Sequence, residues 1–368
     1  LRCLPGGCPA GFPFRSVAMK KSLLEVQRTF LRNARLRLVF LAAVLGAAWY
    51  FGTVDRVSGD ELRLWEKVRT AQDHLFRWRE DRGVAPEEGS DREKTGFIGV
   101  EWSPLTTTLG PLEAKRTAAD PLWAVHALRS FRALGIGEGD NVALLSSSSF
   151  PGLVYSILAA AEHLGADVLW IHSLGASTWG ANNPSLPWPV MASVLRQGGF
   201  LSRKADWYTL GGRGEMGLDL PEEGRNILED TAAEENVPLL KASSLSGMIE
   251  AKTRLITDFA PQLTVSVGGG AAAFAGNDSE FLRGGLFFPP PEGAVPPGDG
   301  VLQRLLAAGI PVLHFLNMKE MASEAGIPYD GAPAPRFVSL RSAAVSAAGV
   351  AFFFLFLIFH RRWDRWKP

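Results

Sequence analysis

Hydrophobic and polar positions alternate between two periods from about residue 120 onward. Short apolar runs such as 142–145, typical of strands buried on both faces, are followed by stretches with apolar residues every three or four positions, typical of helices. This alternation predicts an α/β fold with a mostly parallel open sheet and helices on both faces, a Rossmann-like arrangement. The expected strands are 142–145, 167–172, 206–210, 238–241, 262–267 and 310–315, and the expected helices are 151–164, 188–197, 222–231, 244–258 and 301–308, after a first helix that follows Asp120.

Two longer apolar segments, 38–54 and 342–359, flank this region. The first follows a stretch rich in arginine and lysine, and the second is followed by the basic sequence HRRWDRWKP. Because basic flanks favour the cytoplasmic side of a membrane, this pattern predicts two transmembrane helices with the segment between them outside the cytoplasm. The alternatives are a cleaved signal peptide for the first segment and a buried core helix for the second.

Just after the first apolar segment, Leu64, Val68, Ala71 and Leu75 recur at helical spacing, which predicts a stalk helix packed on the main domain or on a second copy of the chain. The predicted organisation therefore has six parts. The parts are a basic cytoplasmic segment 1–37, a transmembrane helix or signal anchor 38–54, a stalk helix and loop 55–92, an extracytoplasmic α/β domain 93–330, a transmembrane helix 342–359 and a basic cytoplasmic tail 360–368.

Cysteine usage and net charge exclude several classes of site. The two cysteines, Cys3 and Cys8, precede Met19 in a stretch that we interpret as a candidate over-extended gene start, so no disulfide, thiol nucleophile or thiolate metal site is expected in the main domain. The 38 basic and 38 acidic residues balance, and no basic stripe interleaved with aromatic residues occurs, so nucleic acid is not an expected partner.

The loops after the expected strands are rich in small and hydrogen-bonding residues. They are SSSSFPG (146–152), SLGASTWGANNP (173–184), GGRGEMG (211–217), GGGAAAFAGND (268–278) and NMKE (317–320). Because ligands of open parallel sheets bind beyond the carboxyl ends of the strands, these loops predict one shared binding site.

The chemistry of these loops favours an anionic ligand. Serine hydroxyls lie at the start of the helix near Pro151, where free backbone amides attract carboxylate or phosphate, and Arg213 can contact a carboxylate in a bidentate manner. The alternatives are ordinary helix caps for the serines, a flexible turn for the glycines and a solvated surface position for Arg213. The predicted ligand-binding residues are Ser148, Ser149, Ser177, Trp179, Asn182, Arg213, Gly268, Gly269 and Gly270.

Catalytic residues are harder to predict. Ser149 occupies the place of a strand-to-helix nucleophile but lacks the flanking glycine pattern, and His172 and His314, near expected strand ends, are weak candidates for a base with buried core positions as the alternative. The sequence contains no HExxH motif, no dinucleotide fingerprint and no Walker lysine, so we expect neither a metal nor a cofactor.

Five segments of the chain resemble the bacterial poly-gamma-glutamate system protein family. They are TGFIGVEWSPLTTTLGPLEAKRTAADP (95–121), SSFPGLVYSILAAAEHLGA (148–166), SLGASTWGANNP (173–184), LGGRGEMGLDLPEEGR (210–225) and VSVGGGAAAFAG (265–276). The resemblance implies an accessory protein at the bacterial cytoplasmic membrane, with the synthase and export proteins and the anionic polymer as partners. The alternative is a hydrolase or transferase acting on the polymer at the same cleft.

Overall fold

The chain forms two compact units, a small one made of residues 1–54 and 341–368 and a large one made of Asp55–Leu340. The computed structural model describes residues 16–275, 281–291, 298–338, 347–356 and 358. Cys3, Cys8 and the basic tail 360–368 therefore lie outside the described residues.

The small unit contains the long helix α1 (Ser16–Thr53). Its segment Leu36–Thr53 has 18 residues and a mean hydropathy of 1.6, and among the described residues it is the one helix long and apolar enough to cross a membrane. An N-terminal signal sequence has the same length and composition, so both interpretations of residues 38–54 stay open.

The prediction of a second spanning helix at 342–359 is corrected by the structure. The described residues of that segment form a shorter apolar helix, Ala347–Phe356. Among the described residues this helix does not qualify as a second candidate span. The other residues of the predicted segment, 342–346, 357 and 359, lie outside the described part.

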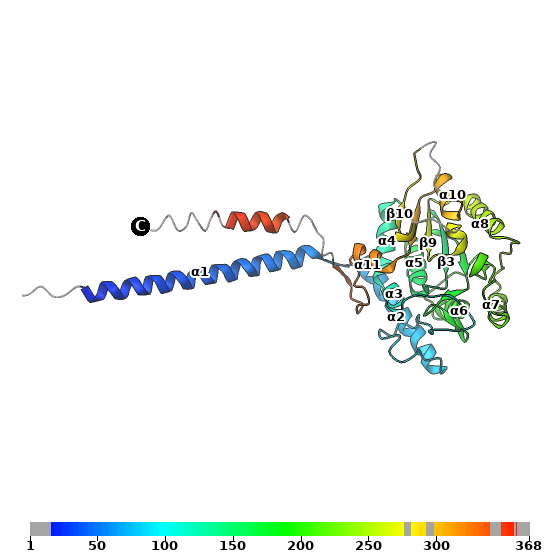
Figure 1. Cartoon of the computed structure of the whole chain (residues 1–368), viewed down its shortest axis with the longest axis horizontal. Helices are drawn as coiled ribbons and strands as arrows, with labels where there is room; N and C mark the ends of the chain where they lie inside the picture. Colours follow the sequence, from blue (N-terminus) through cyan, green and yellow to red (C-terminus); the bar gives the residue numbers. More distant parts are fainter. Residues whose placement is uncertain (1–15, 276–280, 292–297, 339–346, 357, 359–368) are drawn as a thin grey trace, which may run out of the picture. The chain divides into compact units, whose positions relative to one another are not determined.

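The large unit is built on a mixed, mostly parallel six-stranded sheet with the order β10-β11-β9-β3-β4-β8. The predicted α/β fold with a mostly parallel sheet is thus confirmed (Figure 1). The parallel strands are β3 (Asn141–Ser147), β4 (Asp167–Ser173), β8 (Trp207–Thr209), β9 (Leu263–Val267) and β11 (Val312–Phe315), and β10 (Gly285–Phe287) pairs antiparallel with β11.

Two details of the sheet differ from the sequence prediction. The strand expected at 238–241 is reduced to a single parallel bridge between Leu239 and Tyr208. Strand β10 was not expected, because three residues are too few for an alternating pattern to be recognised.

Helices cover both faces of the sheet, because successive strand residues point to opposite sides. In β3, Val142 and Leu144 belong to one hydrophobic core while Ala143 and Leu145 belong to the other. The first core is completed by α2 (Asp60–Asp81), α4 (Leu122–Ala133), α5 (Pro151–Leu164), α6 (Trp188–Gln197) and α7 (Glu222–Glu234), and the second by α8 (Leu245–Phe259) and α10 (Val301–Ala307).

Helix α2 is one of the core helices of the large unit and not a separate stalk. Leu64, Val68, Ala71 and Leu75 are fully buried, and the helix packs against α4, α5 and α6. The predicted apolar face is therefore confirmed, and its partner is the α/β domain. The predicted parts 55–92 and 93–330 both lie in the compact unit Asp55–Leu340.

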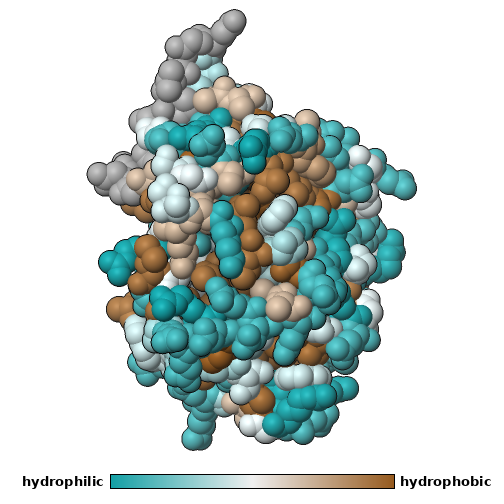
Figure 2. Space-filling view, turned by 90° about the vertical axis from the view of Figure 1, so that its right-hand side faces the viewer, coloured by the Kyte–Doolittle hydropathy of each residue, from teal (hydrophilic) through white to brown (hydrophobic). Residues whose placement is uncertain are grey.

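The outer surface on the side of α7, α8 and α10 is mainly hydrophilic, with hydrophobic residues visible in a hollow between polar ones (Figure 2).

Several short elements complete the large unit. The short elements are β1 (Val54–Arg56) paired with β12 (Arg336–Val338), β2 (Thr106–Thr108) paired with β5 (Ala176–Ser177), β6 (Asn182–Asn183) paired with β7 (Leu186–Pro187), the helices α3 (Leu112–Ala118), α9 (Ala271–Phe274) and α11 (Met318–Ala325), and two 3-10 turns, Arg213–Glu215 and Phe281–Arg283.

The carboxyl group of Asp120, at the start of α4, makes the free energy of unfolding depend on pH. Its Oδ1 accepts a hydrogen bond from the Leu122 amide at 2.8 Å, and burial raises the pKa of Asp120 to about 7. In the unfolded chain the ordinary pKa is 3.8, so the unfolded state releases this proton first and the stability falls as the pH rises from about 4 to about 7.

We therefore expect Asp120→Asn to become more stable relative to the wild type as the pH is raised from 4.5 to 8. The part of the pKa difference that lies between pH 4.5 and 7 corresponds to a change of about 3 kcal/mol. Urea unfolding at both pH values measures it, with Asp258→Asn, an exposed position on α8, as the control. The same pH dependence in wild type and Asp120→Asn would contradict the prediction.

Candidate functional site

A cleft of about 750 Å³ lies at the carboxyl ends of the parallel strands. The chain continues from β3 to β4 and β8 on one side and returns to β9 and β11 on the other, so the strand order reverses between β3 and β9. Open sheets bind ligands at such a reversal. The lining residues include Gly110, Lys115, Ser147, Ser149, Phe150, Ser173, Ser177, Arg213, Glu215, Asp219, Gly269, Gly270, Lys319 and Tyr329.

The serines after β3 alternate between the cleft and the core. Ser147 and Ser149 line the cleft, whereas Ser146 and Ser148 face His172, with their Oγ atoms 2.8 Å from Nδ1 and 2.9 Å from Nε2. The prediction that Ser148 belongs to the binding site is therefore corrected. Its hydroxyl is fully buried and forms a hydrogen bond with His172 inside the core.

Both histidines proposed as bases are core residues. His172 is fully buried, and burial lowers its pKa well below the ordinary value, so it is a neutral ring between two serine hydroxyls. His314, also fully buried, lies 5.2 Å from the Phe274 ring, and burial lowers its pKa to about 4. Neither is among the described residues that line the cleft.

The long loop 173–184 folds down onto the domain. Its residues Ala176–Ser177 form β5, and the Asn182 side chain accepts from the Val100 amide at 3.0 Å and donates to the Val100 carbonyl at 2.9 Å. Gly180 permits this packing, because a Cβ atom there would lie 2.7 Å from the Ser148 carbonyl oxygen.

The predicted site residues of this loop accordingly separate. Ser177 lines the cleft. Asn182 is fully buried and holds the segment around Val100 in place, so its assignment to the ligand site is corrected. Trp179 lines a neighbouring groove of about 730 Å³ together with Trp102 and Leu109, and not the main cleft.

The loop 211–217 presents Arg213 at the cleft. Arg213 is exposed, and its amide donates to Asp219 Oδ1 at 2.8 Å, a contact that shapes the turn. Of the glycines after β9, Gly269 and Gly270 line the cleft. Gly268 lines a much smaller adjoining cavity, so its predicted place in the main binding site is corrected.

A buried ion pair that the sequence did not reveal anchors the same loop. Glu215 accepts from the Lys252 ammonium at 3.0 Å, from Ser173 Oγ at 2.6 Å and from Thr209 Oγ1 at 2.9 Å. Burial alone would raise the pKa of Glu215, but the Lys252 charge and these hydrogen bonds hold it below its ordinary value. Glu215 is therefore an ionised carboxylate that fastens the loop to the ends of β4 and β8.

The second unexpected residue is Lys115 on α3, which lies at the cleft wall. Its Nζ donates to the Ser177 Oγ at 2.6 Å and to the Ser149 carbonyl oxygen at 2.5 Å, and it lies 3.7 Å from the Phe150 ring centroid. The side chain has no carboxylate partner among the described residues, and burial lowers its pKa to about 7. In the sequence it resembled a solvated charge within LEAKRT, so only the fold reveals it.

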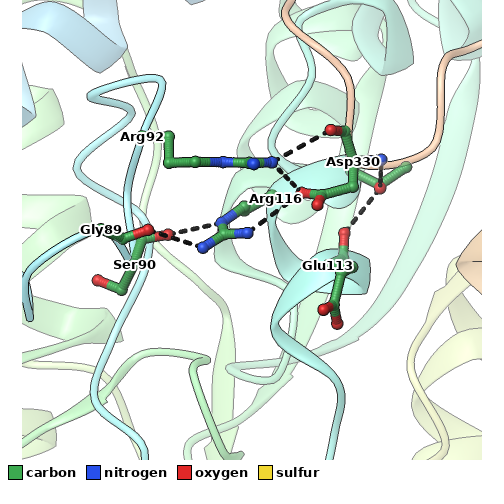
Figure 3. Close-up of polar contacts among 7 residues, drawn as sticks. Gly89, Ser90, Arg92, Glu113, Arg116 and Asp330 are labelled. Atoms are coloured by element: carbon green, nitrogen blue, oxygen red, sulfur yellow. Dashed lines mark hydrogen bonds and ion pairs between the residues drawn. The ribbon is translucent and has the colours of Figure 1, made fainter.

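Helix α3 is held in place by Arg116, next to Lys115 in the chain (Figure 3). The Arg116 guanidinium donates to the Gly89 carbonyl at 2.7 Å and to the Ser90 carbonyl at 2.8 Å, and it pairs with Asp330 at 3.4 Å. Arg92 binds the same carboxylate at 2.6 Å. These contacts connect the loop after α2, which contains Gly89, Ser90 and Arg92, with α3 and with Asp330. Asp330 is next in the chain to Tyr329, which lines the cleft.

The described residues contain no group of three or more histidine, cysteine, aspartate or glutamate side chains placed to hold a metal ion. Comparison of the chain with protein-family models, with curated proteins and with solved structures gives no match.

Removing one partner of the Glu215–Lys252 pair should be costly, because the other charge stays buried. We expect Glu215→Leu and Lys252→Leu each to lower the free energy of unfolding by about 3–5 kcal/mol, and the double replacement to lose clearly less than the sum. Urea unfolding measures all three, with Glu250→Leu, exposed on the same helix as Lys252, as the control. Additive losses would contradict a coupled pair.

Proposed function

We propose that this chain is a membrane-anchored accessory protein of a bacterial poly-γ-glutamate synthesis or export system, and that its cleft binds the anionic polymer. The observation that carries the proposal is the buried Lys115 amine, which has no carboxylate partner among the described residues, at the wall of a cleft whose exposed cations are Arg213 and Lys319. Every residue of poly-γ-glutamate carries a free carboxylate, which is the partner such groups prefer.

The charge of the cleft supports an anionic ligand. Its lining contains three basic side chains and two acidic ones, and of the two acidic ones Glu215 is already neutralised by Lys252. Asp219 accepts the Arg213 amide, so its charge is partly satisfied within the loop. The balance left for a ligand is positive.

The segments that resemble the poly-gamma-glutamate system family also support the proposal. Parts of all five supply lining residues of this one cleft, among them Lys115, Ser149, Ser177, Arg213 and Gly269. These segments thus contribute polar groups that converge on one concave cavity, as in small-molecule binding sites.

The membrane location is proposed from the apolar segment Leu36–Thr53 and its basic flank. In this proposal the segment anchors the large unit on the outer side of the cytoplasmic membrane, where a polymer leaves its synthase and exporter. Strands β1 and β12, which pair with each other, bring the entry and exit of the large unit together.

Replacement of Arg213 tests the binding site. We expect Arg213→Ala to weaken binding of a short γ-linked glutamate oligomer at least tenfold, because a charge-assisted hydrogen bond contributes about 1.5–3 kcal/mol. The melting temperature should change little, since Arg213 is exposed. Calorimetric titration of the full chain in detergent micelles measures the affinity, with Arg254→Ala, exposed on α8 and outside the cleft lining, as the control.

Absence of binding by the wild type would reject the proposed function. Equal affinity in wild type and Arg213→Ala would remove Arg213 from the site.

The pH dependence of binding gives a second test. The Lys115 ammonium loses its proton around pH 7, so we expect affinity for the oligomer to fall between pH 6 and pH 8.5, while the carboxylates of the ligand stay ionised. The Lys115→Gln variant should bind more weakly at pH 6 and show a much flatter profile. The same steep profile in Lys115→Gln would show that another group is responsible.

A further inference from the structure

We propose that Ser177 and Lys115 form a nucleophile–base pair that cleaves or transfers γ-glutamyl amide bonds at this cleft. The inference rests on the proposed function for its substrate class, but its chemistry stands on the two side chains and their surroundings. It differs from the catalytic candidates expected from the sequence, because it uses neither His172 nor His314 and assigns the nucleophile to Ser177.

The geometry meets the requirements of a serine–lysine pair. Lys115 Nζ lies 2.6 Å from Ser177 Oγ, within the distance needed for proton transfer, and both residues line the cleft. Two further contacts fix the lysine, the Ser149 carbonyl at 2.5 Å and the Phe150 ring at 3.7 Å. A base that is held in place and not neutralised by a carboxylate is free to exchange its proton with the serine.

The cleft gives a substrate room to reach the pair. A Cβ atom at Gly110 would lie 3.3 Å from both Lys115 Nζ and Ser177 Oγ, so the glycine leaves space beside this largely buried pair at the cleft wall. The Ser149 hydroxyl, whose oxygen accepts the Ser177 amide at 3.0 Å, lies beside the nucleophile and also lines the cleft. Its proton is available to a carbonyl oxygen that gains negative charge during attack.

Burial supplies the protonation state that this chemistry requires. An ordinary lysine is almost fully protonated at neutral pH, whereas burial lowers the pKa of Lys115 to about 7 and leaves a sizeable neutral fraction. The neutral amine is the form that can accept the serine proton.

The reaction then balances without any further reagent. Lys115 Nζ accepts the Ser177 hydroxyl proton as Oγ bonds to the carbonyl carbon of the amide, and the proton passes from Lys115 to the departing amine as the C–N bond breaks. The acyl group is now an ester on Ser177. Water attacks this ester and gives a proton to Lys115, which returns it to Ser177 Oγ as the acid leaves, while a second amine in place of water gives transfer.

The experiment uses the full chain in detergent micelles with two readouts. A fluorophosphonate probe, which phosphonylates activated serines, is applied from pH 5.5 to pH 8.5 and located by peptide mass spectrometry, and poly-γ-glutamate is incubated with the protein and sized by gel filtration. We expect labelling of Ser177 that rises at least fivefold through pH 7, together with shortening of the polymer, or its transfer when an amine is added.

Three variants give the comparison. Ser177→Ala should lose both labelling and cleavage, and Lys115→Gln should reduce labelling of Ser177 at least tenfold at pH 7.5. Ser185→Ala, an exposed position of the following turn, should behave as the wild type. Melting temperatures verify that each variant is folded.

The outcomes separate this inference from the proposed function. Polymer binding without labelling or cleavage overturns the nucleophile–base pair and leaves the binding function intact. Labelling that survives Ser177→Ala overturns the assignment of the nucleophile, and labelling unchanged in Lys115→Gln overturns the role of the lysine. Labelling without any binding or cleavage of poly-γ-glutamate overturns the γ-glutamyl substrate and with it the proposed function.

Discussion

The central strand β3 imposes the constraint on which the rest of the large unit depends. It pairs in parallel with β4 on one side and with β9 on the other, so three strands end at the same edge of the sheet. Because the chain proceeds outward in both directions from β3, the loops that follow β3 and β9 diverge to opposite faces and leave a crevice between them. The cleft exists because of this reversal, and its residues are those that follow the strands.

Keeping that crevice open requires the surrounding loops to be fastened elsewhere. Asn182 fastens the loop after β4 to the segment around Val100, and the Glu215–Lys252 pair fastens the loop after β8 to the strand ends. Arg116 fixes the position of α3 through its hydrogen bonds to the Ser90 and Gly89 carbonyls. Such contacts are needed because a helix of seven residues is not stable by itself. The buried contacts of Asn182 and of the Glu215–Lys252 pair cost desolvation, and in exchange they fix the positions of the loops around the cleft.

The elements with a clear period could be predicted from the sequence. Helices α5 and α6 begin and end at the predicted residues, and the strand cores of β3, β4, β9 and β11 lie where short apolar runs occur. The edge strand β10 and the bridge at Leu239 could not be predicted, because pairing with a neighbour determines them and local sequence does not.

The candidate site could be predicted only to the level of the loops. Ser149, Ser177, Arg213, Gly269 and Gly270 do line the cleft, whereas Ser148 and Asn182 point into the core. A one-residue step along the chain after β3 changes the direction of a serine, and composition carries no information on that direction. Lys115 is missed for a related reason, since it comes from a short helix that does not follow any strand of the central six-stranded sheet in the sequence.

The two buried lysines show why one serves the structure and the other is available for chemistry. Both are almost completely buried, at 4% exposure each, yet Lys252 faces the Glu215 carboxylate, whereas the described partners of Lys115 are neutral oxygen atoms and an aromatic ring. A carboxylate partner compensates the charge inside the fold, so Lys252 has no need of a ligand. Neutral acceptors satisfy the hydrogen bonds of Lys115 but leave its charge uncompensated, and the lysine can resolve this in two ways, by binding an anion from the cleft or by giving up its proton. Its position on the cleft wall permits both, so binding of a carboxylate and activation of Ser177 belong to opposite protonation states of one amine.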